Sequence, residues 1–379
     1  MDKHKYLGIW LESNGSNNET FKERRNKLLP EITVIHDKLK DMKLGKFHVQ
    51  TALQLRESIL MGKLLYGTEV MFNIGNDNMK VINQIDTIFL RKLLDTPCST
   101  PIINIYQDLG ILTPNHLIIR KRIMYLQHIL NSKETSLIKM TFLVQNKKTK
   151  KGDWAETVQK DLADIDLDLD HITNMSKNQL KRILNMKLVK KQLSEMKVKT
   201  ENRTKMKHLK FEELKLAEYL SPDSKIIKFS QQQLMFKIRN QTIDLKVNYK
   251  HGLKNLNCRM GCNNLENLNH LVNECPKLSA EDEVHIDIDI NDKESKELKQ
   301  LVDIIEKKLI KREELEKLNN KENNERVLNK KRKKVDIETE DDNKVCKKKR
   351  LDTNDEKEKR IKKTPASNLI VIGPLSDLD

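Results

Sequence analysis

The sequence predicts a mainly α-helical protein, and three observations support this fold class. Glycine and proline occur only 11 and 8 times in 379 residues, while Leu, Ile, Lys, Glu and Asn dominate. Several long segments carry apolar residues close to the 3.6-residue period of an amphipathic helix. Hydrophobic residues make up 37% of the chain and aromatic residues only 4%, which is enough for a modest helical core but too little to fold the whole length. We therefore expect a folded helical part and an unfolded part.

The first element, HKYLGIWLES within residues 1–19, is expected to be a strand that runs into an Asn/Gly/Ser turn. Residues 20–146 show repeated helical patterns and are expected to form one helical domain. Pro30 lies inside the first of these patterns and predicts a kink or restart. Gly67 predicts the C-terminal end of the second helix.

Residues 147–250 are expected to form a helical, basic connector that begins with the linker KKTKKGD. The segment ADIDLDLDH places aspartates at alternate positions between residues 164 and 170. On one face of a strand such carboxylates could bind a cation, but a solvated surface turn is the favoured interpretation. Lys-rich helical patterns follow this acidic run.

Residues 251–280 contain CRMGCNNLENLNHLVNECP, in which Cys258, Cys262, His270 and Cys275 have spacings of three, seven and four intervening residues. Three thiolates and one imidazole are a common ligand set for a structural zinc ion, and such a set leaves no position open for catalysis. Gly261 allows the tight turn that presents the first two sulfurs. The sequence therefore predicts a structural Zn²⁺ in a CCHC zinc knuckle. The alternatives are unrelated thiols beside a core histidine, or a relic of the motif that no longer binds metal.

The C-terminal region begins with residues 281–318, where VHIDIDI has strand-like alternation and residues 295–318 form an amphipathic helical pattern. Residues 319–379 are rich in Lys, Glu, Asp and Asn with few apolar anchors, which predicts a disordered basic and acidic tail. The terminal NLIVIGPLSDLD resembles a SUMO-interacting motif, although docking on its own domain, or chance, is favoured over that interpretation.

Charge and targeting signals narrow the functional classes. Lys and Arg outnumber Asp and Glu by 72 to 56, which gives a net charge of +16. This excess favours a polyanionic partner, nucleic acid before an anionic membrane. Neither a signal peptide nor an apolar run approaching about 18 residues is visible, so we expect an intracellular protein without a membrane-spanning helix. The odd number of cysteines, five, argues against a disulfide framework.

Two groups of basic residues are candidates for binding. One would contact nucleic-acid phosphates without sequence preference, or else forms an ordinary solvated face. Its members are Lys181, Arg182, Lys187, Lys190, Lys191, Lys246, Lys250, Lys254 and Arg259. The other lies in the expected tail and suits a nuclear-import receptor or nucleic acid, or has no function beyond solvation. Its members are Lys330, Lys331, Arg332, Lys333, Lys334, Lys347, Lys348, Lys349 and Arg350.

The order of several segments resembles the C-terminal half of reverse transcriptases from non-LTR (LINE-type) retrotransposons. These segments are HKYLGIWLES, ILMGKLLYGTEVMF, TIFLRKLLDTPCSTP, DLGILTPNHLIIRKRIMYLQHIL, GDWAETVQKDL, FKIRNQTIDLKVNY and the closing CCHC element that ends in ECP. The resemblance covers about residues 3–278. It implies that residues 1–19 are the last part of the palm, that 20–146 form the thumb, that 147–250 are a connector, and that 251–280 bind nucleic acid.

The resemblance also implies what the chain does not contain. Polymerases of this family hold two metal ions with aspartates, one pair of them in a Phe/Tyr-x-Asp-Asp turn upstream of the YLG segment. The one Asp-Asp pair here, Asp341-Asp342, lies in the expected tail. We therefore expect a nuclear protein, with the cytoplasm as a further location, that binds RNA or DNA and has no polymerase activity by itself. The alternative is a host-adopted scaffold that recruits proteins through residues 295–318 or 368–379.

Overall fold

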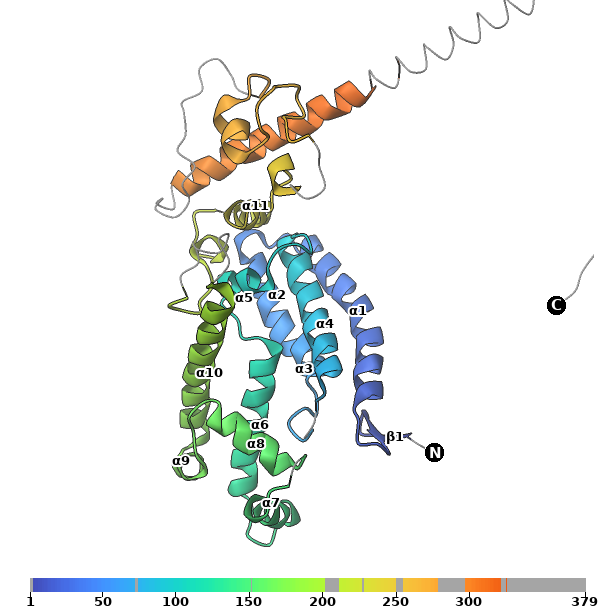
Figure 1. Cartoon of the computed structure of the whole chain (residues 1–379), viewed down its shortest axis with the longest axis vertical. Helices are drawn as coiled ribbons and strands as arrows, with labels where there is room; N and C mark the ends of the chain where they lie inside the picture. The colour runs from blue at the N-terminus through green and yellow to red at the C-terminus, as the bar shows by residue number, and fades with distance from the viewer. Residues whose placement is uncertain are drawn as a thin grey trace, which may run out of the picture. The chain divides into compact units, whose positions relative to one another are not determined.

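Helices make up most of the residues that the computed structural model describes, which confirms the predicted mainly α fold class (Figure 1). The structure describes residues 3–71, 74–150, 152–201, 211–226, 228–249, 255–278, 297–321 and 325. The chain divides into two units, Met1–Lys311 and Arg312–Asp379, and every contact described below lies within the first. Several features singled out in the sequence lie outside the described residues. They are the VHIDIDI segment, the two basic clusters of the tail, the terminal apolar motif, Lys250 and Lys254.

The N-terminal segment is a β-hairpin and not the single strand that the sequence predicts. Strands β1 (Lys3–Tyr6) and β2 (Ile9–Glu12) pair antiparallel, with Tyr6 opposite Ile9. The two residues between them, Leu7 and Gly8, have φ angles of 46° and 81°. Two consecutive positive φ angles are typical of the type I′ turn that joins tightly paired strands. The prediction was wrong because YLG, which looks like strand sequence, forms the reversal itself.

Helix α1 (Asn18–Asp41) continues through Pro30 without the predicted restart. Pro30 is exposed, so the carbonyl group that loses its helical hydrogen bond there can bind water instead. The opposite side of α1 is buried, including Phe21, Ile32 and Leu39. This buried side packs against α4 (Asn76–Leu94), whose own apolar positions repeat at helical spacing as predicted.

A single helical rod lies between α1 and α4 in sequence. It consists of α2 (His48–Leu55), the π-helical turn η2 (Arg56–Leu60) and α3 (Met61–Leu64). The helix ends at Leu64, before the predicted stop, and Gly67 lies in the following turn with a φ of 71°. A chain reversal of this kind needs the left-handed conformation that glycine adopts readily.

A buried polar network ties this rod to α4 and to α5 (Ile102–Leu109). The Arg56 guanidinium, in the π turn, donates two hydrogen bonds of 2.6 Å to the two carboxylate oxygens of Asp86. The Tyr106 hydroxyl donates a third, also 2.6 Å, to Asp86 Oδ2. Asp86 is fully buried, and three donated hydrogen bonds compensate its charge. One residue from each of three elements therefore meets at this point.

The remaining helices pack around α6 (Pro114–Leu130). They are α7 (Leu137–Lys147), α8 (Trp154–Ala163), α9 (Leu169–Asn174) and α10 (Lys177–Thr200), with α10 lying along α6 (Figure 1). The helices on the two sides of the expected linker, α7 and α8, both contact α6, so they belong to one unit. The chain then continues through η4 (Glu218–Leu220), α11 (Phe229–Arg239) and η5 (Lys246–Tyr249).

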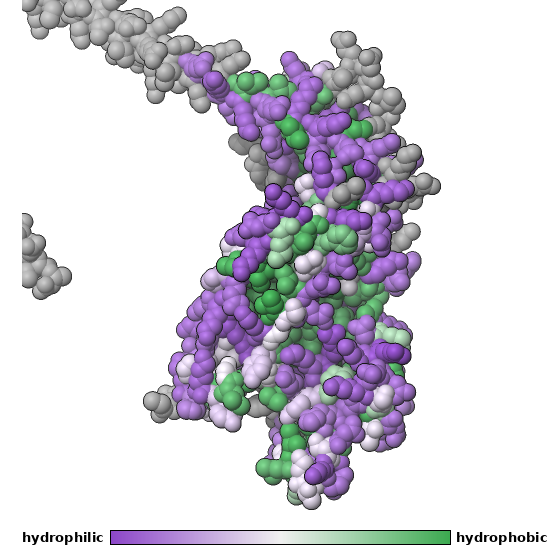
Figure 2. Space-filling view, turned by 180° about the vertical axis from the view of Figure 1, so that it is seen from behind, coloured by the Kyte–Doolittle hydropathy of each residue, from purple (hydrophilic) through white to green (hydrophobic). Residues whose placement is uncertain are grey.

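The face of the molecule that Figure 2 shows is mostly hydrophilic, as the high share of charged residues leads one to expect. Helix α7 is an exception, because Leu137 and Val144 are 79% and 67% exposed. Among the described residues, no helix combines the length and apolar character needed to cross a membrane.

Candidate metal centre

Cys258 and Cys262 lie on a tight turn that the local sequence explains. The N–H of Cys258 donates to the carbonyl oxygen of Asn264 at 2.9 Å, beside an isolated β-bridge between Asn257 and Leu265. Gly261 has a φ of 85°, and its N–H donates to the carbonyl oxygen of Cys258 at 3.1 Å. The left-handed conformation at Gly261 turns the chain back on itself, as predicted, and brings the second sulfur toward the first.

His270 and Cys275 are brought together by a π-helical turn, η6 (His270–Glu274). Their spacing of five residues is one more than the four that an α-helical turn brings onto one face, so a regular α-helix would not align them. The structure instead shows the N–H of Cys275 donating to the carbonyl oxygen of His270 at 2.8 Å. This i to i+5 hydrogen bond is that of a widened turn, and such turns occur often at functional sites.

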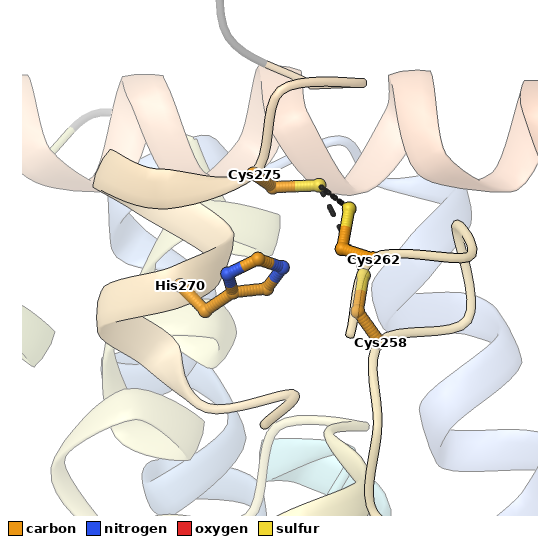
Figure 3. A group of neighbouring side chains, drawn as sticks. All are labelled: Cys258, Cys262, His270 and Cys275. Atoms are coloured by element: carbon orange, nitrogen blue, oxygen red, sulfur yellow. Dashed lines mark hydrogen bonds between the residues drawn. The ribbon is translucent and has the colours of Figure 1, made fainter. Parts of the chain in front are cut away.

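The four side chains converge on one point (Figure 3). The Sγ atoms of Cys258 and Cys275 are 3.9 Å apart, and those of Cys262 and Cys275 are 3.7 Å apart. One ligand atom from each of the four residues lies within 4.8 Å of all the others. A tetrahedral zinc ion with metal–sulfur bonds of about 2.3 Å holds its sulfurs about 3.8 Å apart. The geometry therefore fits a four-coordinate metal ion of that size.

The histidine supports the same interpretation. His270 is 1% exposed, and neither of its ring nitrogens has a hydrogen-bond partner. A buried imidazole with two unsatisfied nitrogens is costly unless another ligand occupies one of them. The ring faces the three sulfurs (Figure 3), while Nδ1 lies 3.6 Å from Glu274 Oε2. A carboxylate beside the second nitrogen is the usual support for a metal-bound histidine.

Burial raises the pKa of the Cys258 and Cys275 thiols. Without metal, both groups are therefore protonated at neutral pH. Because the thiolate is the form that binds metal, metal binding must displace these protons. Metal affinity is consequently expected to fall as the pH falls.

Arg259, a candidate for contact with phosphate, lies between Cys258 and Cys262 and is held by acidic residues. Its guanidinium forms an ion pair with Asp244 at 2.7 Å and another with the buried Glu266 at 2.9 Å. The backbone N–H of Arg259 also donates to Glu266 at 2.9 Å. Lys246, another candidate, donates from Nζ to the carbonyl oxygen of Asn257 at 2.6 Å. Both side chains thus take part in the internal structure of this region.

The five candidate cations on α10 have two different environments. Lys181, Arg182 and Lys190 are exposed. Lys187 pairs with Asp166 at 3.0 Å, and Lys191 pairs with Asp164. The acidic segment ADIDLDLDH therefore lies at the surface and pairs with lysines of α10, which agrees with the solvated surface turn that the sequence favoured over a cation site. Asp168, in the same turn, caps α9 by accepting a hydrogen bond from the N–H of His171 at 2.8 Å.

The helix over residues 297–321 contacts η6 and the residues just after it, and the sequence did not predict this contact. Lys308 is 3% exposed, and its Nζ donates to the carbonyl oxygen of Val272 at 2.6 Å. Lys311 donates to the carbonyl oxygen of Leu278 at 3.3 Å. Among the apolar residues of this helix, Val302 and Ile305 are fully buried. The helical period was visible in the sequence, but no sequence signal indicated which segment it would contact.

The fold and the site together define a mainly helical protein with one cluster of side chains suited to a metal ion. Within the described ranges, Cys258, Cys262, His270 and Cys275 are the one group of three or more His, Cys, Asp and Glu side chains close enough to share an ion. No protein-family model matches the chain, and no match was found among curated proteins or solved structures.

Proposed function

We propose that this chain is a nucleic-acid-binding protein whose CCHC cluster holds a structural zinc ion. In this proposal it corresponds to the thumb, connector and zinc knuckle of the non-LTR reverse transcriptases that its sequence resembles. The observation that carries the proposal is the convergence of four ligand atoms, from two separate turns, to within 4.8 Å of one another.

The ligand set favours zinc in a structural role. Three sulfurs and one imidazole nitrogen complete a tetrahedron, so no position is left for a substrate or a water nucleophile. The described element that contains them, residues 255–278, has few buried apolar residues of its own, among them Met260, Leu271 and Val272. A metal ion supplies the folding free energy that so small an apolar cluster lacks.

The excess of positive charge supports nucleic acid as the partner. The net charge is +16, and Lys181, Arg182 and Lys190 are exposed on α10 without an ion pair to any described residue. Cations of this kind bind phosphates by releasing counterions, which gives salt-sensitive affinity without base preference. The import clusters of residues 329–334 and 346–350 fit a nuclear location in the same proposal.

Nucleotidyl transfer is not part of the proposed function. That reaction uses hard cations held by carboxylate oxygens. The metal-binding cluster found in the described part of the chain offers soft ligands and a closed coordination shell instead. Incubation with a primed template and deoxynucleotides is therefore expected to give no primer extension.

The test compares the wild-type chain with the double variant Cys262→Ser/Cys275→Ser. The matched control is Cys98→Ser, because Cys98 is an exposed free cysteine outside the cluster. Wild type and control should each contain one zinc ion per chain by mass spectrometry under native conditions, and the double variant none. Nucleic-acid affinity of the wild type should fall steeply as salt rises. Lack of zinc in the wild type, or affinity insensitive to salt, would contradict the proposal.

The same variants separate this function from the scaffold alternative. The scaffold hypothesis assigned partner binding to the amphipathic segment 295–318, but its apolar residues Leu301, Val302 and Ile305 are buried within the chain. That side of the helix is thus not open to a partner. If the double variant kept a protein partner and unaltered nucleic-acid affinity, the scaffold hypothesis would be favoured instead.

A further inference from the structure

A basic groove lies between α6 and the N-terminal end of α10, well away in sequence from the cysteine cluster. Its volume is about 680 Å³, within the range of about 300–1,000 Å³ that ligand sites occupy. Four cationic side chains line it, namely Arg120, Lys121, Lys177 and Lys181, against the single carboxylate of Glu69. Of these four, Lys181 alone is also a phosphate-binding candidate from the sequence.

The cations of the groove differ in how far they are already compensated. Arg120 pairs with Glu57 at 3.2 Å, and Lys121 donates to the carbonyl oxygen of Leu65 at 2.9 Å. Lys177 and Lys181 are exposed and make no ion pair with a described residue. Both lie in the first turns of α10, where the helix dipole adds positive potential. This end of the groove therefore attracts anions most strongly.

The groove also presents aromatic rings. Tyr125 and His128 both line it, and their ring centroids lie 6.2 Å apart. The Tyr125 ring is fixed in place by Trp154, on which it packs edge to face with centroids 5.9 Å apart. An inorganic anion needs only the cations, whereas a nucleotide unit also needs a flat surface for its base. The groove combines cations with two aromatic rings, of which Tyr125 is held by Trp154, and this combination favours a nucleotide unit over an inorganic anion.

We propose that this groove binds a single-stranded segment of nucleic acid, with phosphates at Lys177 and Lys181 and a base against Tyr125 and His128. An unpaired base is required because a base inside a duplex is already stacked on its neighbours, so its face is not available to a protein ring. The inference rests on the proposed nucleic-acid binding and assigns it a location and a strandedness.

The first experiment uses the full-length, zinc-loaded chain and fluorescent twelve-residue oligo-dT and oligo-U, with a hairpin duplex for comparison. The variant Lys177→Glu/Lys181→Glu is matched by Lys197→Glu/Lys199→Glu, an exposed pair on the same helix outside the groove lining and outside the candidate phosphate-binding set. The groove variant should lose about tenfold or more in single-strand affinity, and its salt slope should fall by about 1.4, the contribution of two single-strand phosphates. The control pair should lose less than about threefold.

Two further measurements make the result decisive. Lys177 lies in the first turn of α10, where glutamate is favourable, and Lys181 is exposed, so the groove variant should keep the melting temperature of the wild type. Oligonucleotides that carry 5-iodouridine should crosslink, on irradiation, to the peptide that contains Tyr125 and His128. Equal losses in both variants, with crosslinks elsewhere, would overturn this inference while leaving the proposed function intact. No nucleic-acid binding by the wild type would overturn both.

Discussion

Lys308 donates a hydrogen bond of 2.6 Å from its Nζ atom to the main-chain oxygen of Val272. Val272 lies in η6, the π-helical turn that separates the metal-ligand candidates His270 and Cys275. Lys308 lies in the helix over residues 297–321, and its side chain is 3% exposed. A buried ammonium group thus holds the turn on which the spacing of two ligands depends.

Replacing Lys308 should loosen the metal centre. In Lys308→Met the carbonyl oxygen of Val272 loses this donor, which costs about 1–3 kcal/mol of folding free energy for a buried group. The expected result is faster zinc release to a coloured chelator and a lower melting temperature of the zinc-loaded protein. Lys307→Met is the control, because Lys307 is exposed on the same helix. Equal zinc release from both variants would show that Lys308 does not support the turn.

Removing the acidic turn beside α10 should increase nucleic-acid affinity. Asp164 and Asp166 pair with Lys191 and Lys187, so Asp164→Asn/Asp166→Asn removes the opposing charge from both lysines, while Lys187 keeps its hydrogen bond to the main-chain oxygen of Asp166. Affinity at low salt should rise several-fold, and the salt slope should steepen by about 1 to 2. The control Asp37→Asn/Asp41→Asn makes the same change in net charge at exposed positions of α1. An equal rise in the control would attribute the effect to net charge alone.

The Arg56–Asp86 pair should contribute strongly to the stability of the helical unit. Asp86→Ala removes the acceptor of three hydrogen bonds and leaves a buried guanidinium without its counter-charge. Breaking a buried ion pair in this way costs about 3–5 kcal/mol. Asp77→Ala is the matched control, since Asp77 lies on the same helix, is 89% exposed and pairs with Lys80 in solvent. Urea unfolding measures both variants, and the free energy of unfolding of the control should fall by less than about 1 kcal/mol.

Stability should fall in mild acid because two histidines are buried in the neutral form. Burial lowers the pKa of both His36 and His116 from 6.5 to about 4. Between pH 4 and 6.5 the unfolded chain binds a proton at each position that the folded chain does not bind, so the free energy of unfolding rises with pH. Each histidine should therefore remove about 2 kcal/mol of stability between pH 7 and pH 5.

Urea unfolding of the zinc-loaded protein at both pH values measures this effect. His36→Gln keeps a hydrogen-bond donor for the carbonyl oxygen of Phe89, which lies 3.1 Å from His36 Nε2, but removes the titrating group. The variant should lose about 2 kcal/mol less than the wild type on acidification. An unchanged difference between pH 7 and pH 5 would show that His36 is not buried neutral in solution.

The features that the sequence predicted correctly are those encoded by neighbouring residues. Apolar spacing in α1, α4 and α10 indicated the helices, because a 3.6-residue period is a local property of the chain. The ligand set was visible for a similar reason, since Cys, His and Gly261 are recognised by type and spacing. Local signals were misleading at two places. Helix α1 continues through Pro30, where solvent can satisfy the free carbonyl group, and the strand-like YLG sequence forms the tight turn at Leu7-Gly8.

Tertiary contacts decided the rest, because they join residues far apart in the sequence. The sequence by itself determined the helical class, the excess of cations and the four candidate metal ligands. Only the folded structure decided that Arg259 and Lys191 face carboxylates. It also decided that Lys308 contacts η6, and that Lys177 and Lys181 share a groove with Tyr125. A cation is available to a phosphate only if no carboxylate lies beside it. Which carboxylate lies beside a given cation is set by the packing of segments that are far apart in the sequence.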